Sequence, residues 1–175
     1  MTESRRLIDS PVGPILLSAD GSGRLVGAQF GSGSATVTSR YPEVTGQAAS
    51  RVLDDAAAQL GEYFEGRRRC FEIPLAMTGS PFQRRVWAQL QQIPFGTTVS
   101  YGQLAMQLGR PRAARAVGHA NARNPVAVIV PCHRVIGSSG RLTGYGGGLS
   151  AKRRLLDLEA GGAPLLGTAR EGLRQ

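Results

Sequence analysis

The stretch SYGQLAMQLGRPRAARAVGHAN, residues 100–121, has the pattern of two short helices joined by a tight turn. Ser100 and Gln103 have the spacing of a capping box, which satisfies backbone N–H groups at a helix start. The first helix is expected to end at Gly109 and to bury Leu104, Ala105 and Leu108. Pro111 is a favourable first residue for the second helix. The stretch therefore predicts a helix-turn-helix.

The second helix separates small residues from basic ones. The residues expected to face inward are Ala113, Ala116, Val117 and Ala120. The residues expected on the opposite side are Arg112, Arg115 and His119, at spacings of three and four. A basic face on the second helix of such a pair favours nucleic-acid binding. The alternative is a helical hairpin within an ordinary core.

The charge of the chain fits a nucleic-acid partner without requiring one. The formal net charge is +9, and Lys152 is the only lysine beside many arginines, whose planar forks suit phosphates and base edges. A GC-rich coding bias would produce the same excess of arginine, glycine and alanine. Every apolar run is shorter than the about 18 residues that a membrane span needs. The first residues do not resemble a signal peptide. We therefore expect a soluble intracellular protein.

The first half of the chain predicts a small sheet and one helix. Short apolar runs between turn signals over residues 7–26 predict a strand meander, and residues 31–47 predict a loop. A helix ending near Gly66 follows, because apolar residues recur at four-residue steps at Val52, Ala56, Leu60 and Phe64. Residues 70–75 predict a strand in which Cys70 packs inside.

A second helix is expected after a polar connection near residues 76–80. Ser80 and Pro81 form a favourable helix start, and one apolar stripe follows, formed by Phe82, Val86, Trp87 and Leu90. We expect a domain over residues 1–78, a second over residues 79–160, and a flexible tail over residues 161–175.

Residues 124–131, NPVAVIVP, predict a buried strand that ends at Cys132 and His133. A thiol becomes a nucleophile when it is deprotonated, and a neighbouring histidine, oriented by a carboxylate, is a sufficient base. Taken alone, the Cys132-His133 pair favours a structural cysteine over a nucleophile. Two cysteines and two histidines give no recognisable metal-ligand spacing, so we expect no metal and no cofactor.

Several motifs together resemble the O6-alkylguanine-DNA alkyltransferases, also called methylated-DNA–protein-cysteine methyltransferases. Pro131-Cys132-His133-Arg134-Val135 resembles the active-site motif of that family. The other matching motifs, in the same order, are Ser100-Tyr101, residues 112–118, Asn124-Pro125, residues 145–148, and the segment from Lys152 to Glu159. The resemblance is close over residues 80–160 and loose over the first 75. It implies an α+β fold in which a ribonuclease-H-like αβ domain precedes a helical, winged-helix-like DNA-binding domain.

The resemblance also implies an activity and a role for individual residues. Cys132 would accept an alkyl group from O6 of guanine in DNA, with O4 of thymine left open as a second substrate, and the protein would be consumed. His133 would act as a base through water, Glu159 would hold the imidazole, and Asn124 would brace the turn. Tyr101 would contact the target phosphate and polarise the purine.

The resemblance places the remaining residues around a flipped base. Arg115 would fill the stack that the base leaves, with the second helix in the minor groove of double-stranded DNA. The carbonyls of Cys132 and Val135 would accept from the guanine amine, and the pocket wall would comprise Tyr145, Gly146 and Gly147. Further DNA contacts map to Gln83, Gly102, Arg110 and Ser138. The role of His119 and any association between copies along DNA remain open.

Three rival functions are compatible with parts of the pattern. A non-catalytic binder of alkylated bases would carry another residue in place of Cys132. A papain-type thiol hydrolase would need a substrate cleft and repeated turnover. A helix-turn-helix regulator would bind by promoter sequence rather than by lesion. The alkyltransferase is the hypothesis that uses all the motifs, in a cytoplasmic bacterial protein without the zinc site or sensor domain found in some members.

Overall fold

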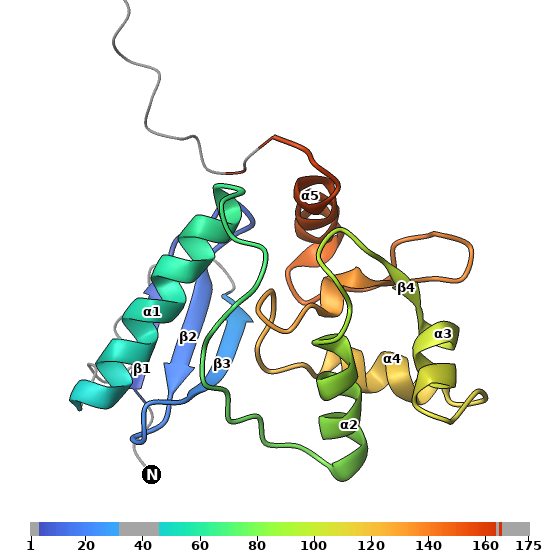
Figure 1. The fold of residues 1–175 in the computed structure, drawn as a ribbon, viewed down its shortest axis with the longest axis horizontal. Coiled ribbons are helices and arrows are strands. Elements are labelled where there is room, and N and C mark those ends of the chain that lie inside the picture. The colour runs from blue at the N-terminus through green and yellow to red at the C-terminus, as the bar shows by residue number, and fades with distance from the viewer. Residues whose placement is uncertain (1–3, 32–45, 164, 166–175) are drawn as a thin grey trace, which may run out of the picture.

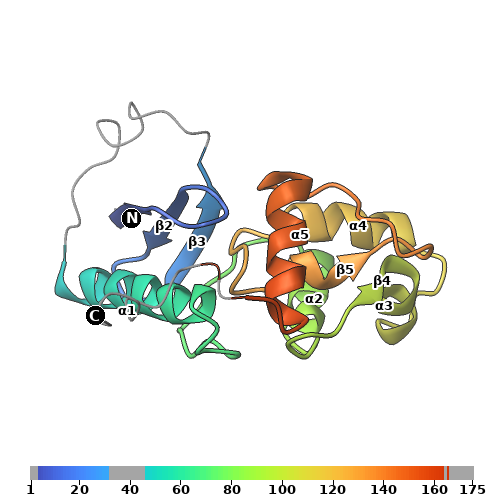
Figure 2. The same cartoon turned by 90° about the horizontal axis from the view of Figure 1, so that it is seen from above.

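The computed structural model describes residues 4–31, 46–163 and 165. The predicted loop over residues 31–47 and the predicted tail after residue 160 fall largely outside the described residues. Figures 1 and 2 show two units side by side, one with a sheet and a long helix and one mostly helical. Among the described residues, no helix is long and apolar enough to cross a membrane.

The first unit is a three-stranded antiparallel sheet covered by one helix. The strands β1 (Ser4–Ile8), β2 (Ile15–Ala19) and β3 (Leu25–Phe30) are paired in chain order, which confirms the predicted meander. Helix α1 (Gln47–Phe64) lies across the sheet (Figure 1) and buries residues at the predicted spacing. Alternate residues of β2, including Ile15 and Leu17, are buried beneath it.

The second unit combines four helices with a short parallel ladder. Its elements are α2 (Pro81–Leu90), β4 (Val99–Ser100), α3 (Tyr101–Gln107), α4 (Ala114–Ala122), the 3-10 turn η2 (Cys132–Arg134), β5 (Val135–Ile136) and α5 (Gly148–Glu159). Val99 pairs with Val135 and Ser100 with Ile136. Helix α3 therefore begins directly beside the end of the cysteine motif.

The predicted capping boxes are present at α2 and α3. Ser80 accepts from the backbone of Gln83, and the Gln83 side chain accepts from the backbone of Ser80. Ser100 and Gln103 make the same reciprocal pair at α3. Each box satisfies two N–H groups that the helix cannot pair itself.

Residues 70–75 do not form the predicted strand, because the chain there pairs mainly with a helix side chain. The side-chain amide of Gln59 on α1 accepts a hydrogen bond from the backbone N–H of Glu72 at 2.9 Å and donates to its carbonyl at 3.2 Å. A single parallel bridge joins Leu25 to Leu75. Cys70 is exposed, so the prediction that it packs inside is wrong.

Most of residues 124–131 are buried, as predicted, but the stretch forms a folded turn instead of a strand. One parallel bridge joins Val126 to Ala28 of β3, and Val128 then adopts φ 70°, a value that few non-glycine residues take. The Asn124 side chain holds the turn through the N–H of Val126 and the carbonyl of Val130, at 3.0 and 2.8 Å.

Helix α4 begins later than predicted and is turned about its axis. Pro111 and Arg112 lie in the turn before it, and Ala113 is its N-cap. Ala116 is exposed, contrary to prediction, because the buried face is formed by Val117, Ala120 and Asn121. The polar residue Asn121 therefore shares the buried face with Val117 and Ala120, where the apolar pattern predicted Ala113 and Ala116.

We predict that Ser100→Ala lowers the free energy of unfolding by about 1 kcal/mol, because it removes the N-cap acceptor of α3. Urea denaturation of the purified protein measures the change. Ser139→Ala is the matched control, since Ser139 lies in an exposed turn. Equal stability of Ser100→Ala and the control would contradict the assigned role of the cap.

Candidate active site

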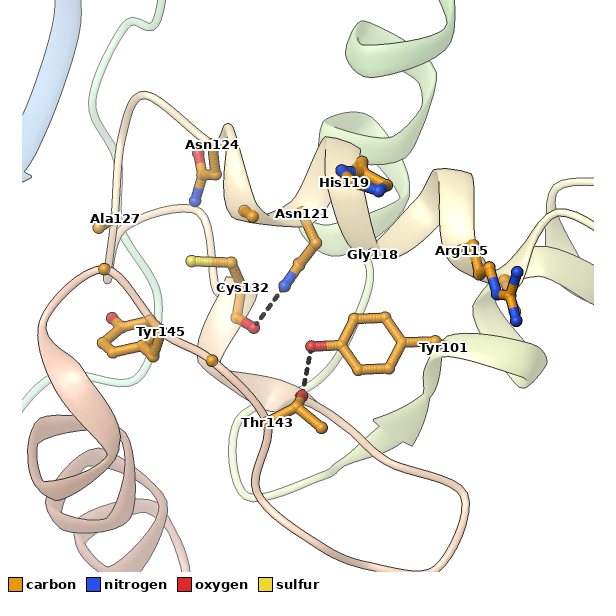
Figure 3. Close-up of a pocket in the computed structure, with 14 residues that line it drawn as sticks. Tyr101, Arg115, Gly118, His119, Asn121, Asn124, Ala127, Cys132, Thr143 and Tyr145 are labelled. Carbon is orange, nitrogen blue, oxygen red and sulfur yellow. Dashed lines mark hydrogen bonds between the residues drawn. The ribbon is translucent and has the colours of Figure 1, made fainter.

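A pocket of about 790 Å³ lies between α3, α4, the Asn124 turn and the loop of residues 143–146 (Figure 3). Six of the predicted site residues line it: Tyr101, Arg115, Asn124, Cys132, Tyr145 and Gly146. His119 lines it as well. The structure therefore brings residues from widely separated parts of the sequence to one cavity.

Cys132 is the first residue of η2 and is only 6% exposed. Burial raises the pKa of its thiol, while a hydrogen bond from Asn124 and the charge of Lys152 act in the opposite direction without cancelling the rise. Cys132 therefore rests as a protonated thiol and needs a base before it can act as a nucleophile.

His133 is fully buried and its Nε2 lies 2.8 Å from Oε1 of Glu159. Because an ionised carboxylate can only accept, Nε2 carries the hydrogen and Nδ1 carries the lone pair. Nδ1 is buried with no hydrogen-bond partner among the described residues. Burial lowers the pKa of His133 despite the opposing effect of Glu159, so the imidazole is neutral and able to take a proton.

Glu159, near the end of α5, receives donors from three segments. Arg134 donates through Nε at 2.8 Å and Nη2 at 3.0 Å, and the Tyr63 hydroxyl of α1 donates at 2.7 Å. The backbone N–H of Gly96 donates to the other oxygen at 3.2 Å. Burial alone would raise the pKa of Glu159, but hydrogen bonds from His133 and Arg134 lower it from 4.5 to about 2.

Two further buried side chains hold the backbone of the motif. Lys152 on α5 is fully buried and donates to the carbonyls of Val135 and Thr143, at 2.7 and 3.3 Å. Asn121 on α4 donates from Nδ2 to the carbonyl of Cys132 at 3.3 Å (Figure 3). Both carbonyls that the sequence predicted to face a base therefore already accept at least one hydrogen bond.

The pocket mouth is formed by Tyr101, Arg115 and the glycine loop. The Tyr101 hydroxyl lies 2.8 Å from Oγ1 of Thr143, while Arg115 extends from the exposed side of α4 (Figure 3). Tyr145 packs edge-on against Phe30 of β3, with ring centroids 5.4 Å apart. Gly147 leaves no room for a side chain beside Phe30, since a Cβ atom would lie 2.9 Å from that ring.

The other predicted residues lie outside the pocket lining. Gln83 is engaged in the α2 capping box, Gly102 is in the first turn of α3, and Ser138 is in an exposed loop. Arg110 places its guanidinium over the ring of Phe82, 5.6 Å from the centroid. Val135 is buried in β5.

Sequence reasoning missed four residues that shape the site: Asn121, Thr143, Lys152 and Tyr63. Lys152 carried a usable signal, because it is the only lysine in an arginine-rich chain and stands on the same helix as Glu159. No such signal marks Asn121, Thr143 and Tyr63 in the sequence. Their hydrogen-bond partners in the site, Cys132, Tyr101 and Glu159, are 11, 42 and 96 positions away in the sequence.

Family models for the 6-O-methylguanine DNA methyltransferases match nearly the whole described chain. The DNA-binding domain model matches residues 81–161, and the ribonuclease-like domain model matches residues 4–77. The chain belongs to the 6-O-methylguanine DNA methyltransferase family. The predicted family and the predicted α+β fold are confirmed.

Curated relatives and solved structures agree with this assignment. A methylated-DNA–protein-cysteine methyltransferase of Mycobacterium tuberculosis H37Rv is 46% identical over 166 residues, covering 91% of this chain and 93% of the relative. One of Mycolicibacterium paratuberculosis is 50% identical over 161 residues, with the same coverage. A crystal structure of the Mycobacterium tuberculosis OGT in complex with DNA matches with TM-score 0.79 at 46% identity, over 92% of this chain and 95% of that chain.

We predict that the free energy of unfolding falls as the pH drops below 6.5, because the unfolded chain binds a proton at His133 that the folded chain resists. The slope from this group approaches about 1.4 kcal/mol per pH unit. A further loss follows between pH 4.5 and about 2, where Glu159 is protonated more readily in the unfolded chain. Urea denaturation at a series of pH values measures both losses.

His133→Gln is the matched variant for the upper pH range, because glutamine keeps an N–H donor for Glu159 and does not titrate. Its stability should change less between about pH 7 and about pH 5.5 than that of the wild type. An identical slope in the two proteins would show that His133 does not cause the loss.

Proposed function

We propose that this chain repairs alkylated DNA by transferring an alkyl group from O6 of guanine to Sγ of Cys132. The observation that carries the proposal is the position of Cys132 in a pocket beside a helix-turn-helix, followed in the chain by a histidine that a buried glutamate holds. Family membership and the relative solved with DNA support the same activity.

The proposed reaction uses His133 to activate the thiol. The proton of Cys132 passes through water to Nδ1, where the charge of Glu159 stabilises the imidazolium. The thiolate attacks the alkyl carbon, so a C–S bond forms as the C–O6 bond breaks. The electron pair of the broken bond stays on the guanine. Overall, the guanine exchanges its alkyl group for the proton of the thiol. No oxidant, metal or cofactor is required.

The product explains why we propose a single turnover. A thioether, unlike the thioester of a cysteine hydrolase, contains no carbonyl for water to attack. Cys132 therefore stays alkylated, and each protein molecule repairs one base. The papain-type alternative needs a hydrolysable intermediate that this chemistry does not form.

We propose that α4 binds double-stranded DNA in the minor groove and that the damaged base is flipped into the pocket. Arg115 is exposed on α4 at the pocket lining and is placed to fill the vacated stack. Asn124 braces the turn before Cys132, and Tyr101 faces the pocket from the start of α3. The proposed base pocket includes Tyr145, Gly146, Gly147 and the carbonyls of Cys132 and Val135.

Further parts of the proposal concern the chain as a whole. The proposed outer DNA contacts are Gln83, Gly102, Arg110 and Ser138. The chain comprises two proposed domains, residues 1–78 and 79–160, and the separate matches of the two family models support this division. The protein acts in the bacterial cytoplasm. The alternative is a non-catalytic binder of alkylated bases, and peptide mass spectrometry of Cys132 after mixing with methylated DNA distinguishes the two.

We predict that mixing the protein with duplex DNA containing O6-methylguanine adds the mass of one methylene group to the peptide that contains Cys132. Peptide mass spectrometry after digestion measures the gain. Cys70→Ala is the matched control and should still react, because Cys70 is exposed and outside the pocket lining. Cys132→Ala should bind the duplex without any gain. Binding by the wild type without a mass gain would support the non-catalytic alternative.

We predict that Arg115→Ala slows transfer from duplex DNA about tenfold or more, because the gap left by the flipped base stays empty. Transfer from a single-stranded oligonucleotide should slow much less, since no stack has to be replaced. Rapid-quench kinetics on the two substrates measure both rates. Arg51→Ala removes the same charge from the exposed side of α1 and should leave both rates nearly unchanged. Equal slowing on both substrates would refute the stacking role.

A further inference from the structure

Asn121 is a buried polar residue whose amide faces the reactive cysteine. It lies in the last turns of α4, is 5% exposed, and lines the pocket that contains Cys132. Figure 3 shows its side chain extending from α4 toward Cys132. A buried asparagine must satisfy both ends of its amide, or the structure bears the cost of an unpaired polar atom.

Only one end of the amide has a partner. Nδ2 donates to the carbonyl of Cys132 at 3.3 Å, and because a carbonyl only accepts, this contact fixes which end of the amide is the amino group. Oδ1 is buried with no hydrogen-bond partner among the described residues. The pocket lining therefore contains a fixed acceptor without a partner among the described residues, in a side chain that contacts the backbone of Cys132.

The acceptor suits only one part of the proposed substrate. In O6-alkylguanine the O6 atom and the ring nitrogens N1, N3 and N7 carry no hydrogen, so the exocyclic 2-amino group is the only donor. O4-alkylthymine has no donor at all within its ring system. A site with an unpaired acceptor discriminates strongly against a ligand that cannot donate to it, because the acceptor then stays desolvated and unpaired.

We propose that Asn121 is a specificity-determining residue whose Oδ1 accepts one of the two hydrogens of the 2-amino group of the flipped O6-alkylguanine, which leaves the other for the carbonyl of Cys132 or Val135. This inference rests on the proposed function and refines its substrate. The amide then has a partner at both ends, the carbonyl of Cys132 and the base. It favours alkylated guanine over alkylated bases that lack an amino donor.

The test compares two duplexes that differ by one amino group. One contains O6-methylguanine and the other O6-methylhypoxanthine, which is the same methylated base without the 2-amino group. The second-order rate constant of methyl transfer is measured for each with the wild type and with Asn121→Leu, which keeps similar volume and removes the acceptor. The wild type should prefer O6-methylguanine, and Asn121→Leu should reduce that preference about tenfold.

Matched variants separate recognition from general damage to the site. Thr143→Val also replaces a polar pocket residue with an apolar one, and it should leave the ratio of the two rate constants unchanged. Asn121→Ala gives a second removal of the acceptor if the leucine does not fit the pocket. In both Asn121 variants, the rate constant for a duplex with O4-methylthymine should rise relative to the rate constant for O6-methylguanine.

Two different failures are distinguishable. If Asn121→Leu and Asn121→Ala slow both methylated purines equally, Asn121 only positions the carbonyl of Cys132 and the inference is overturned while the proposed function stands. If the wild type transfers no methyl group from O6-methylguanine, the proposed function fails and the inference fails with it. A reduced ratio in both variants, with an unchanged ratio in Thr143→Val, establishes the inference.

Discussion

The buried carboxylate of Glu159 is the interaction on which the rest of the structure depends. A carboxylate removed from water is strongly destabilising unless charged and polar donors surround it, and here Tyr63, Gly96, His133 and Arg134 all donate to it. These donors come from α1, from the loop after α2 and from the cysteine motif, so one charge connects both units of the chain. The contact that orients the imidazole is therefore also a contact that holds the two units together, and the geometry of the site is tied to the integrity of the fold.

The same burial determines the chemistry of Cys132. Both the thiol and the imidazole are neutral at rest, because burial disfavours their charged forms. A thiolate formed there is less stable than one fully exposed to solvent, and it loses its negative charge when it gains an alkyl group. The charge of Lys152, which donates to the carbonyls of Val135 and Thr143, lowers the pKa of Cys132 and so compensates part of that transient charge. Alkyl transfer passes this negative charge to the guanine, where the proton taken up by His133 can neutralise it.

Local signals in the sequence predicted the elements that local interactions determine. Ser80 and Ser100 begin helices because their capping partners are three residues away, and α1 follows from apolar periodicity alone. The errors arose where a distant side chain competes for the backbone. Gln59 takes the backbone groups that would have made residues 70–75 a strand, and Asn124 folds residues 124–131 into a turn that places Val128 at positive φ. The family motifs located Cys132, His133 and Glu159, but the roles of Tyr63 and Lys152 follow only from the three-dimensional contacts.

Asn121 shows why a specificity residue is hard to find from an apolar pattern. Periodicity places asparagine on the solvent side of a helix, yet the buried face of α4 is turned so that its amide reaches Cys132. Three buried polar side-chain atoms lack partners among the described residues: Asn121 Oδ1, His133 Nδ1 and Tyr145 Oη. All three belong to residues at or beside the reactive cysteine, whereas the donors around Glu159 are paired. A folded protein bears such unpaired atoms at a cost in stability, and their concentration around Cys132 is expected of a site whose polar atoms are completed by the substrate.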